Sequence, residues 1–329
     1  MARLKEYNGH YCESEYEYAF IGFLEAEGWK YSSGNNISRV TKRDVLIADD
    51  FKKFIADTNP DLTEDEVIQI YDNVRLVGAE SDFATLHKVY GWMVNGVQFT
   101  TQDGLPRMIP LIDFDNWDKN IFRVVNQFTV EYTNNGQKEN RRPDVLLFVN
   151  GMPLCVIELK NPADANATIY DAWEQINIRY WRDIPHLLHY CPLACISDGV
   201  KTRLGTVRTP YEHFYAWRRV NEGDAVSTLP FAETETMIKG VYAPERFMEI
   251  FRDYIYFQDS IYDSDEVEII CRYPQFFAAK LLKQSIVNSV VTRSGKGGTY
   301  FGATGCGKTY TMAFLARQLA LRCTDIPEI

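Results

Sequence analysis

Residues 142–160 read RPDVLLFVNGMPLCVIELK, two apolar runs joined by Asn150-Gly151. An Asn-Gly pair between apolar runs predicts a β-hairpin, because a type I′ turn needs positive φ at both central residues. The apolar runs indicate that the hairpin is buried. The charged residues of the stretch then lie together at its open end.

The register of this hairpin brings two acidic residues and a lysine close. Folding the chain back at the turn pairs positions whose numbers sum to about 301, which places Asp144 across from Ile157 and beside Glu158. Side chains alternate along a strand, so Glu158 and Lys160 are expected on one face and Leu159 on the other.

Two carboxylates and a lysine at one end of a buried hairpin suggest a metal site. Burying these charges is costly unless something pairs them. A divalent cation held by Asp144, Glu158 and the Leu159 carbonyl would do so, and oxygen ligands with open water positions are what Mg²⁺ prefers. Lys160 would orient or help deprotonate a water at a phosphodiester. The alternative is that Glu158 and Lys160 are a solvated pair at a strand end, because a Glu-x-Lys triplet alone is common.

A second motif lies near the end of the chain. Residues 302–309 (GATGCGKT) match the phosphate-binding pattern GxxxxGK[ST] and are expected between a short strand at 299–301 and a helix at 309–322. Backbone amides of the loop would cradle phosphates, Lys308 would reach the β and γ oxygens, and Thr309 would ligate Mg²⁺. The loop residues that we expect to form this site are Gly302, Thr304, Gly305, Gly307, Lys308 and Thr309.

Composition sets limits on the class of protein. With 46% hydrophobic and 14% aromatic residues the chain is expected to be globular. No apolar stretch approaches the roughly 20 residues that span a bilayer, and seven scattered cysteines without a Cys-x-x-Cys pair are typical of reduced thiols in a cytoplasmic protein. The net charge of −10 argues mildly against nucleic acid, although a nuclease needs only a local basic cleft.

The order of predicted elements indicates an α/β fold. Strand-like texture spans 91–134, followed by the hairpin, a helix at 169–182 and a buried strand at 192–199. The expected core is thus a mixed sheet flanked by helices. Other helices are predicted at 13–27, 36–56, 63–72 (with a capping box from Thr63 and Glu66), 235–257 and 274–291. The acidic residues 258–268 are a plausible connector between a first domain, 1–260, and a second, 261–329.

The Pro-Asp…Glu-x-Lys hairpin resembles the PD-(D/E)xK nuclease superfamily. The longer string RRPDVLLFVNGMPLCVIELKNP closely resembles the N-terminal nuclease of Type I restriction R subunits, as do VVNQF (124–128), AWEQINIRYWRDIP (172–185), CISDGVKTRLGT (195–206) and FYAW (214–217). The resemblance covers most of residues 13–260. It implies a restriction-endonuclease-like fold followed by the start of a RecA-like P-loop domain.

The resemblance also implies further site residues. In that family a glutamate on the first helix faces the metal, and Glu17 is the match, with Glu13 and Glu15 as alternatives. The family carries a Gln and a Tyr four residues apart on the helix after the Glu-x-Lys strand, whereas Gln175 and Tyr180 are five apart here. In a regular α-helix five residues rotate a side chain by roughly 140°. Gln175 is therefore expected in the site and Tyr180 is not.

The second domain resembles superfamily 2 helicases. RYPQ (272–275) is similar to the element whose glutamine reads adenine, here Gln275, although an ordinary helix start is the alternative. Only 20 residues follow Thr309, so the chain is expected to bind ATP weakly and neither to hydrolyse it nor to translocate DNA.

Taken as a member of that family, the chain is expected to be a Type I deoxyribonuclease that cuts double-stranded DNA with Mg²⁺. ATP would serve the full-length subunit, and the partners would be the specificity (S) and methyltransferase (M) subunits, with no membrane. One alternative is the nuclease domain of another helicase–nuclease in phage defence. A second is an assembly module whose nuclease is silent.

Overall fold

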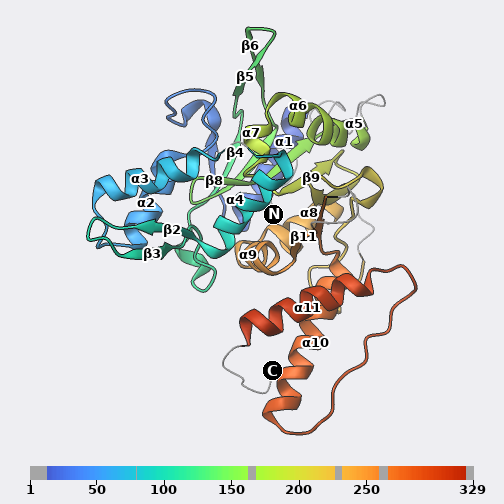
Figure 1. Cartoon of the computed structure of the whole chain (residues 1–329). Coiled ribbons are helices and arrows are strands. Elements are labelled where there is room, and N and C mark those ends of the chain that lie inside the picture. Colours follow the sequence, from blue (N-terminus) through green and yellow to red (C-terminus); the bar gives the residue numbers. More distant parts are fainter. Residues whose placement is uncertain (1–12, 79, 162–167, 227–231, 259–265, 324–329) are drawn as a thin grey trace.

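The fold is a mixed α/β arrangement around one six-stranded sheet (Figure 1). The computed structural model describes residues 13–78, 80–161, 168–226, 232–258 and 266–323. The strand order is β1-β4-β7-β8-β9-β10, with parallel pairing in β1/β4 and β8/β9 and antiparallel pairing elsewhere. The strands are β1 (Lys30–Ser33), β4 (Phe122–Asn126), β7 (Val145–Val149), β8 (Met152–Leu159), β9 (Leu193–Ser197) and β10 (Thr202–Thr206). The predicted mixed sheet flanked by helices is confirmed.

Three two-stranded ribbons lie outside this sheet: β2 (Val97–Thr100) with β3 (Pro106–Ile109), β5 (Val130–Asn134) with β6 (Gln137–Arg141), and β11 (Ile255–Gln258) with β12 (Val267–Ile270). The α-helices are α1 (Glu13–Ala26), α2 (Ala48–Thr58), α3 (Glu64–Arg75), α4 (Asp82–Asn95), α5 (Ile169–Glu174), α6 (Trp181–Asp183), α7 (Pro185–Leu188), α8 (Ala232–Met237), α9 (Pro244–Asp253), α10 (Tyr273–Val291) and α11 (Lys308–Arg322). Two π-helical segments, η3 (Gln175–Tyr180) and η5 (Ile238–Tyr242), continue α5 and α8, and short 3₁₀ turns are η1 (Gly34–Asn36), η2 (Trp117–Lys119) and η4 (Tyr211–His213).

The predicted hairpin is β7–β8, and its turn is held from three sides. Asn150 and Gly151 have φ of 50° and 76°, as the type I′ prediction requires. The buried Asn150 side chain accepts a hydrogen bond from the Ile121 amide and donates one to the Leu111 carbonyl. Gly151 lies so close to α2 that a Cβ there would overlap the Ile47 carbonyl. The turn is therefore fixed by both local conformation and tertiary contact.

The register of β7–β8 differs from the simple prediction. Val149 pairs with Met152 and Phe148 with Pro153, but beyond a β-bulge Leu147 pairs with Cys155 and Val145 with Ile157. Pro153 has no N–H to give to the ladder, and bulges are where strands tolerate proline. The one-residue shift places Asp144 opposite Glu158 instead of Ile157. Because opposite residues share a face, the bulge turns the two carboxylates toward each other.

Helical segments cover both faces of β8. Tyr180 of η3 contacts Glu158, whereas the Tyr242 hydroxyl of η5 lies 3.6 Å from the Cys155 sulfur. Side chains alternate along the strand, so η3 and η5 lie on opposite faces. The predicted placement of Glu158 and Leu159 on opposite faces is confirmed.

Several other predicted elements are confirmed. The helices expected at 13–27, 63–72, 274–291 and 309–322 correspond to α1, α3, α10 and α11, and Thr63 and Glu66 form the predicted capping box. The helix at 169–182 forms as α5–η3–α6, and the strand at 192–199 forms as β9. Most of the acidic connector at 258–268 lies outside the described residues. The predicted domain boundary at 260/261 falls between β11 and β12, which pair.

Other predictions were wrong. No single helix spans 36–56: residues 37–47 are irregular, because the Asp44 carboxylate closes a turn by accepting from the Thr41 amide, and α2 begins only at Ala48. The strand region predicted from residue 91 starts too early, because residues 91–95 belong to α4. Ser81 caps the start of this helix by accepting from the Ala84 amide. The predicted helix at 235–257 is interrupted at Ala243 and ends in β11. Residues 299–301 form no strand, because no described strand lies beside them to complete a ladder.

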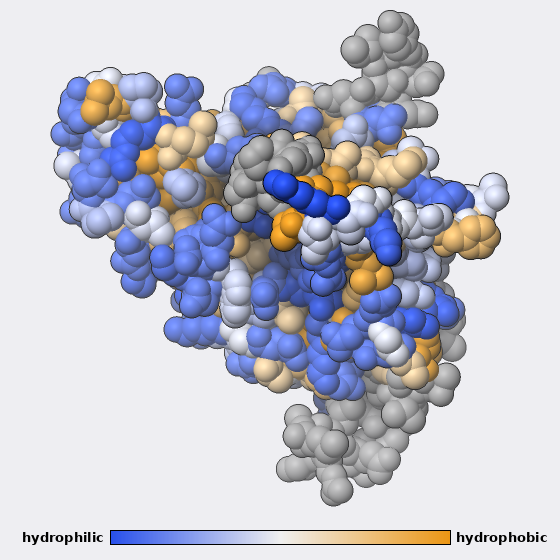
Figure 2. All heavy atoms as spheres, turned by 90° about the horizontal axis from the view of Figure 1, so that it is seen from below, coloured by the Kyte–Doolittle hydropathy of each residue, from blue (hydrophilic) through white to orange (hydrophobic). Residues whose placement is uncertain are grey.

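The surface is mostly hydrophilic where Figure 2 shows it, with hydrophobic residues in small separate groups. No helix in the described part of the chain is both long and apolar enough to cross a membrane. The six cysteines that the structure describes are free thiols, as predicted.

The Asn-Gly turns of the β7–β8 and β5–β6 hairpins allow a matched stability test. Gly151→Ala should lower the free energy of unfolding by about 3 kcal/mol, because alanine strains a positive φ and also overlaps Ile47. Gly136→Ala, in the β5–β6 turn with φ of 79° and open space around it, should cost only about 1 kcal/mol. Urea unfolding of both variants measures the difference, and equal losses would show that the turn's tertiary contact is unimportant.

Candidate active site

The predicted site residues on β7, β8 and η3 converge at the open end of the hairpin. Glu158 is fully buried, and Asp144 follows β6 and immediately precedes β7. One Asp144 oxygen accepts a 2.7 Å hydrogen bond from the Leu159 amide, which ties the carboxylate to β8. The structure therefore brings Asp144, Glu158 and Lys160 together.

A chain of hydrogen bonds links these residues to helix η3. The Lys160 ammonium donates to Gln175 Oε1 at 3.0 Å, and Gln175 Nε2 donates to the Tyr180 hydroxyl at 2.8 Å. That hydroxyl donates to Glu158 Oε1 at 2.5 Å. The second Glu158 oxygen, Oε2, lies 4.0 Å from the Lys160 nitrogen, so the four residues form an almost closed ring.

Tyr180 corrects the sequence analysis, which excluded it from the site. Residues 175–180 form a π-helical turn, in which hydrogen bonds run from i to i+5. Residues five apart then lie on the same face, so Gln175 and Tyr180 both point at β8. The extra residue that separates them is absorbed by the wider turn. Tyr180 is a site residue that spacing in a regular helix could not reveal.

Glu17 approaches from helix α1. It is buried, and its carboxylate accepts a 2.5 Å hydrogen bond from Asn126, whose own oxygen accepts from the Tyr31 hydroxyl at 2.9 Å. Glu15 is exposed, so of these two carboxylates Glu17 is the one held at the site. The side chain of Glu13 lies outside the described part of the structure.

The three carboxyl groups are unlike ordinary surface acids. Burial, reinforced by the charge of Asp144, raises the pKa of Glu158 well above its usual range. Burial also raises the pKa of Asp144, although the Leu159 amide opposes this. Glu17 has a raised pKa for the same first reason, and Asp144 adds to it while Asn126 opposes it. Without a cation, the site thus favours holding protons.

One oxygen of the site has no hydrogen-bond partner. Glu158 Oε2 is buried and accepts no hydrogen bond, because Lys160 is too distant and Tyr180 is committed to Oε1. The Asp144 carboxyl lies within hydrogen-bonding reach of Glu158, but two carboxylates can pair only through a shared proton or a cation. A buried unsatisfied carboxylate oxygen is costly and requires a proton or a cation. Among the described residues, no group of three or more His, Cys, Asp or Glu side chains is placed to hold a metal. A metal here would therefore need backbone and water ligands besides Asp144 and Glu158.

The phosphate-loop residues form a separate group. Gly305 and Gly307 have φ of 78° and 83°, and α11 starts at Lys308. The Lys308 ammonium donates to the carbonyls of Gly302 and Ala303 at 2.8 and 2.9 Å. Gln275 both caps α10, by accepting from the Arg272 amide, and donates to the Gly307 carbonyl at 3.2 Å. Both readings of Gln275 are thus compatible with its position. Thr304 and Thr309 are exposed.

Residues 11–213 match the family described as Type I restriction enzyme R protein N terminus. The chain belongs to this R-protein family. A putative type I restriction enzyme MjaIXP endonuclease subunit of Methanocaldococcus jannaschii is 30% identical over 92% of this chain and 31% of its own length. The type I restriction enzyme HindI endonuclease subunit of Haemophilus influenzae is 28% identical over 93% of this chain and 30% of its own length. The chain therefore spans about a third of the length of these R-protein relatives.

The raised pKa of Glu158 gives a stability prediction with a definite sign. A carboxyl group whose pKa is higher in the folded than in the unfolded state binds more protons when folded, so it destabilises the fold as pH rises above its ordinary value. In EDTA, Glu158→Gln should therefore be more stable than the parent chain at pH 8, with a smaller difference at pH 5. The ratio of the folding equilibrium constants of the two proteins should change by at most about tenfold per pH unit. Urea unfolding at both pH values tests this, and a gap independent of pH would contradict it.

Proposed function

We propose that this chain carries the Mg²⁺-dependent endonuclease of a Type I restriction R subunit, with a PD-(D/E)xK site that cuts double-stranded DNA. The observation that carries the proposal is the buried, unpartnered Glu158 Oε2 beside Asp144 and Lys160. Glu268 is also buried with both carboxylate oxygens unpartnered, so what marks Glu158 is the second carboxylate and the lysine beside it. The endonuclease names of the R-protein relatives support the same conclusion.

The residues present fit a magnesium ion. Asp144, Glu158 and the Leu159 carbonyl would hold it, with Glu17 at its margin, and oxygen donors of this kind suit Mg²⁺. When bound, the ion would stabilise charge on a phosphate and make a water more acidic. It would also satisfy Glu158 Oε2, which the protein leaves without a partner.

The protein's own side chains then position the reaction. Tyr180 fixes the rotamer of Glu158 by holding Oε1, so that Oε2 points away from the helix. Gln175 holds the Lys160 ammonium through its amide oxygen, which leaves that ammonium two further protons to donate to a water or to a phosphate oxygen. Orientation of this kind converts a bimolecular attack into a nearly intramolecular one.

The phosphate loop extends the proposal to nucleotide. The left-handed glycines of the loop and the start of α11 make an anion site, in which Lys308 now bonds backbone carbonyls that a triphosphate would replace. Gln275 lies against the same loop and would face adenine. In the complete subunit ATP would be bound here, while S and M subunits would supply sequence recognition.

The nuclease proposal has a matched test. Glu158→Gln and Asp144→Asn should each weaken Mg²⁺ binding by at least about tenfold and abolish cutting of plasmid DNA by the assembled enzyme. Glu268→Gln is the control, because Glu268 is also buried with both carboxylate oxygens unpartnered but lies outside the site. It should retain metal binding and cutting. If the two site variants bind Mg²⁺ and cut as the parent does, the proposal is wrong.

A separate variant tests the nucleotide site. Lys308→Ala should weaken binding of ATP in the presence of Mg²⁺ by at least about tenfold, because it removes the cation that faces the β and γ phosphates. Lys296→Ala, at an exposed position of the preceding loop, should bind as the parent does. Fluorescent-nucleotide titration measures both, and parental affinity in Lys308→Ala would show that GATGCGKT is no phosphate site.

A further inference from the structure

A long hairpin next to the candidate active site has no part in the proposed chemistry. Strands β5 and β6 project from the body of the molecule (Figure 1) and meet at Asn135-Gly136, where φ is 48° and 79°. The chain leaves β6 at Arg141 and reaches Asp144 three residues later. The hairpin is thus directly continuous with the site.

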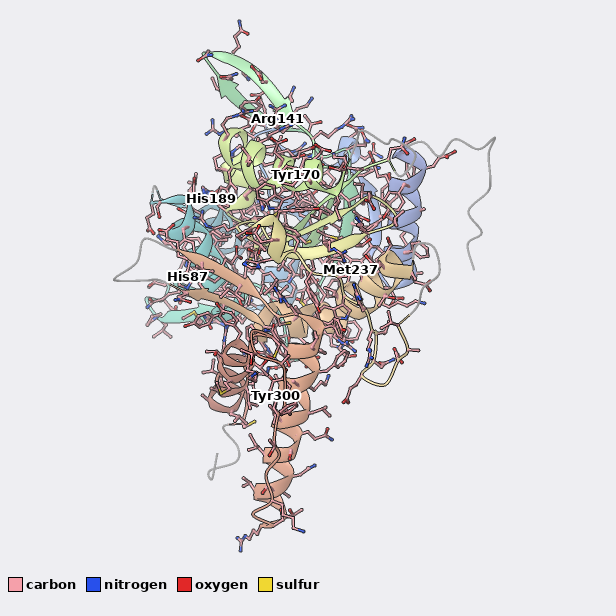
Figure 3. The ribbon with its side chains drawn as sticks, turned by 90° about the vertical axis from the view of Figure 1, so that its right-hand side faces the viewer. His87, Arg141, Tyr170, His189, Met237 and Tyr300 are labelled. Atoms are coloured by element: carbon pink, nitrogen blue, oxygen red, sulfur yellow. The ribbon has the colours of Figure 1, made fainter. Side chains whose placement is uncertain are left out.

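Most side chains of one face of this hairpin have partners within the protein. Tyr132 is buried, and its hydroxyl donates to Glu139 at 2.6 Å. Asn134 donates to the same carboxylate at 2.9 Å. At the foot of the hairpin, where Figure 3 labels it, Arg141 donates to Asp183 at 2.7 Å and packs its guanidinium 5.5 Å from the Tyr132 ring centre.

The clamp between Arg141 and Asp183 ties the hairpin to the site. Asp183 ends α6, which continues directly from the π turn that carries Gln175 and Tyr180. The Asp183 carboxylate is also bonded by Arg182 at 2.8 Å, and these guanidinium contacts lower the pKa of Asp183. The direction of the hairpin is therefore set by the same helix that orients Lys160.

The opposite face is free for a ligand. Thr133 pairs with Lys138 and Glu131 with Asn140, so these four side chains share the second face. Thr133, Lys138 and Asn140 are exposed. The acid of this face, Glu131, bonds Lys138 at 2.8 Å, in a surface pair of little energetic value that a stronger anion can replace.

This free face leads into the carboxylate cluster. Arg142 follows β6 with the same alternation as Lys138 and Asn140 and is exposed, and its charge opposes the burial that raises the pKa values of Glu17 and Asp144. Lysine, hydroxyl, amide and arginine thus form a row of donors that ends at the site. Such donors are those that proteins use on DNA phosphates.

We propose that this face of the β5–β6 hairpin is a docking surface for the phosphate backbone of duplex DNA. The proposal rests on the proposed function. Lys138 is six residues from Asp144, about 20 Å along an extended chain. A phosphate at the site and a second phosphate on the same face of the duplex could then be held at once. No base is read, which suits a nuclease that relies on other subunits for sequence.

The test is the salt dependence of DNA binding by the 329-residue chain, measured with a 30-base-pair duplex of arbitrary sequence in Ca²⁺. Lys138→Gln should weaken binding about threefold to tenfold and reduce the slope of log affinity against log salt by about one. Glu131→Gln should have the opposite effect on affinity, because it frees Lys138. Lys53→Gln is the matched control, since Lys53 is an exposed lysine paired with Asp57 at 2.6 Å on α2, and it should change neither quantity.

The outcomes separate this inference from the nuclease proposal. At saturating DNA, Lys138→Gln should keep the parental cutting rate and Mg²⁺ affinity in the assembled enzyme, so that only the KM for DNA rises. Parental affinity and slope in Lys138→Gln, or absence of any duplex binding by the parent chain, would overturn the docking surface. If substitution of Asp144 and Glu158 leaves Mg²⁺ binding unchanged, the proposed metal site is wrong, and the DNA docking surface still stands.

Discussion

The burial of two like-charged carboxylates side by side is the constraint around which this structure is organised. Asp144 and Glu158 meet because an Asn-Gly turn fixes one end of a hairpin and a bulge at Pro153 shifts its register by one residue. Burial raises the pKa of both groups; the charge of Asp144 adds to the rise at Glu158, whereas the Leu159 amide opposes the rise at Asp144. The Leu159 amide and the Tyr180 hydroxyl each satisfy one oxygen, and a buried oxygen is left over.

Helix η3 shows how backbone geometry decides what residue spacing means. Five residues separate Gln175 from Tyr180, and in an α-helix this would send their side chains in different directions. The π turn restores their alignment, and each then contacts a different end of the Glu158–Lys160 pair. π turns are less stable than α-helix and persist where tertiary contacts hold them. Here the contacts are those of the site itself, together with the Trp181 indole, which donates to the Val207 carbonyl at 2.8 Å just beyond the turn.

The sequence predicted the features that depend on local chemistry and missed those that depend on distant partners. The β7–β8 turn and the capping box of α3 follow from residues within four positions of each other, and both were confirmed. The bulge was not predicted, because simple antiparallel pairing assumes that each residue can donate its backbone N–H, and Pro153 has none. Residues 37–47 were wrongly assigned to a helix because Val45, Leu46 and Ile47 are buried by tertiary contact, in which the Ile47 amide bonds the Gly151 carbonyl at 2.8 Å. A contact across about a hundred residues leaves no periodic signal.

The net charge of −10 is a sum over the whole chain and does not say where the acidic residues lie or what they contact. Many of the acids serve the fold: Asp50 is bound by Arg123 at 2.6 Å, Asp183 by two arginines, and Glu66 by the amides of Thr63 and Gln102. The two amides lower the pKa of Glu66, and the arginines lower that of Asp183, as expected for carboxylates that are built into a structure as anions. Screening limits what a ligand senses to about 8 Å at physiological salt. A phosphate near the site is therefore governed by Arg142, Lys160 and their immediate neighbours, while the total charge describes mainly the behaviour of the chain at a distance.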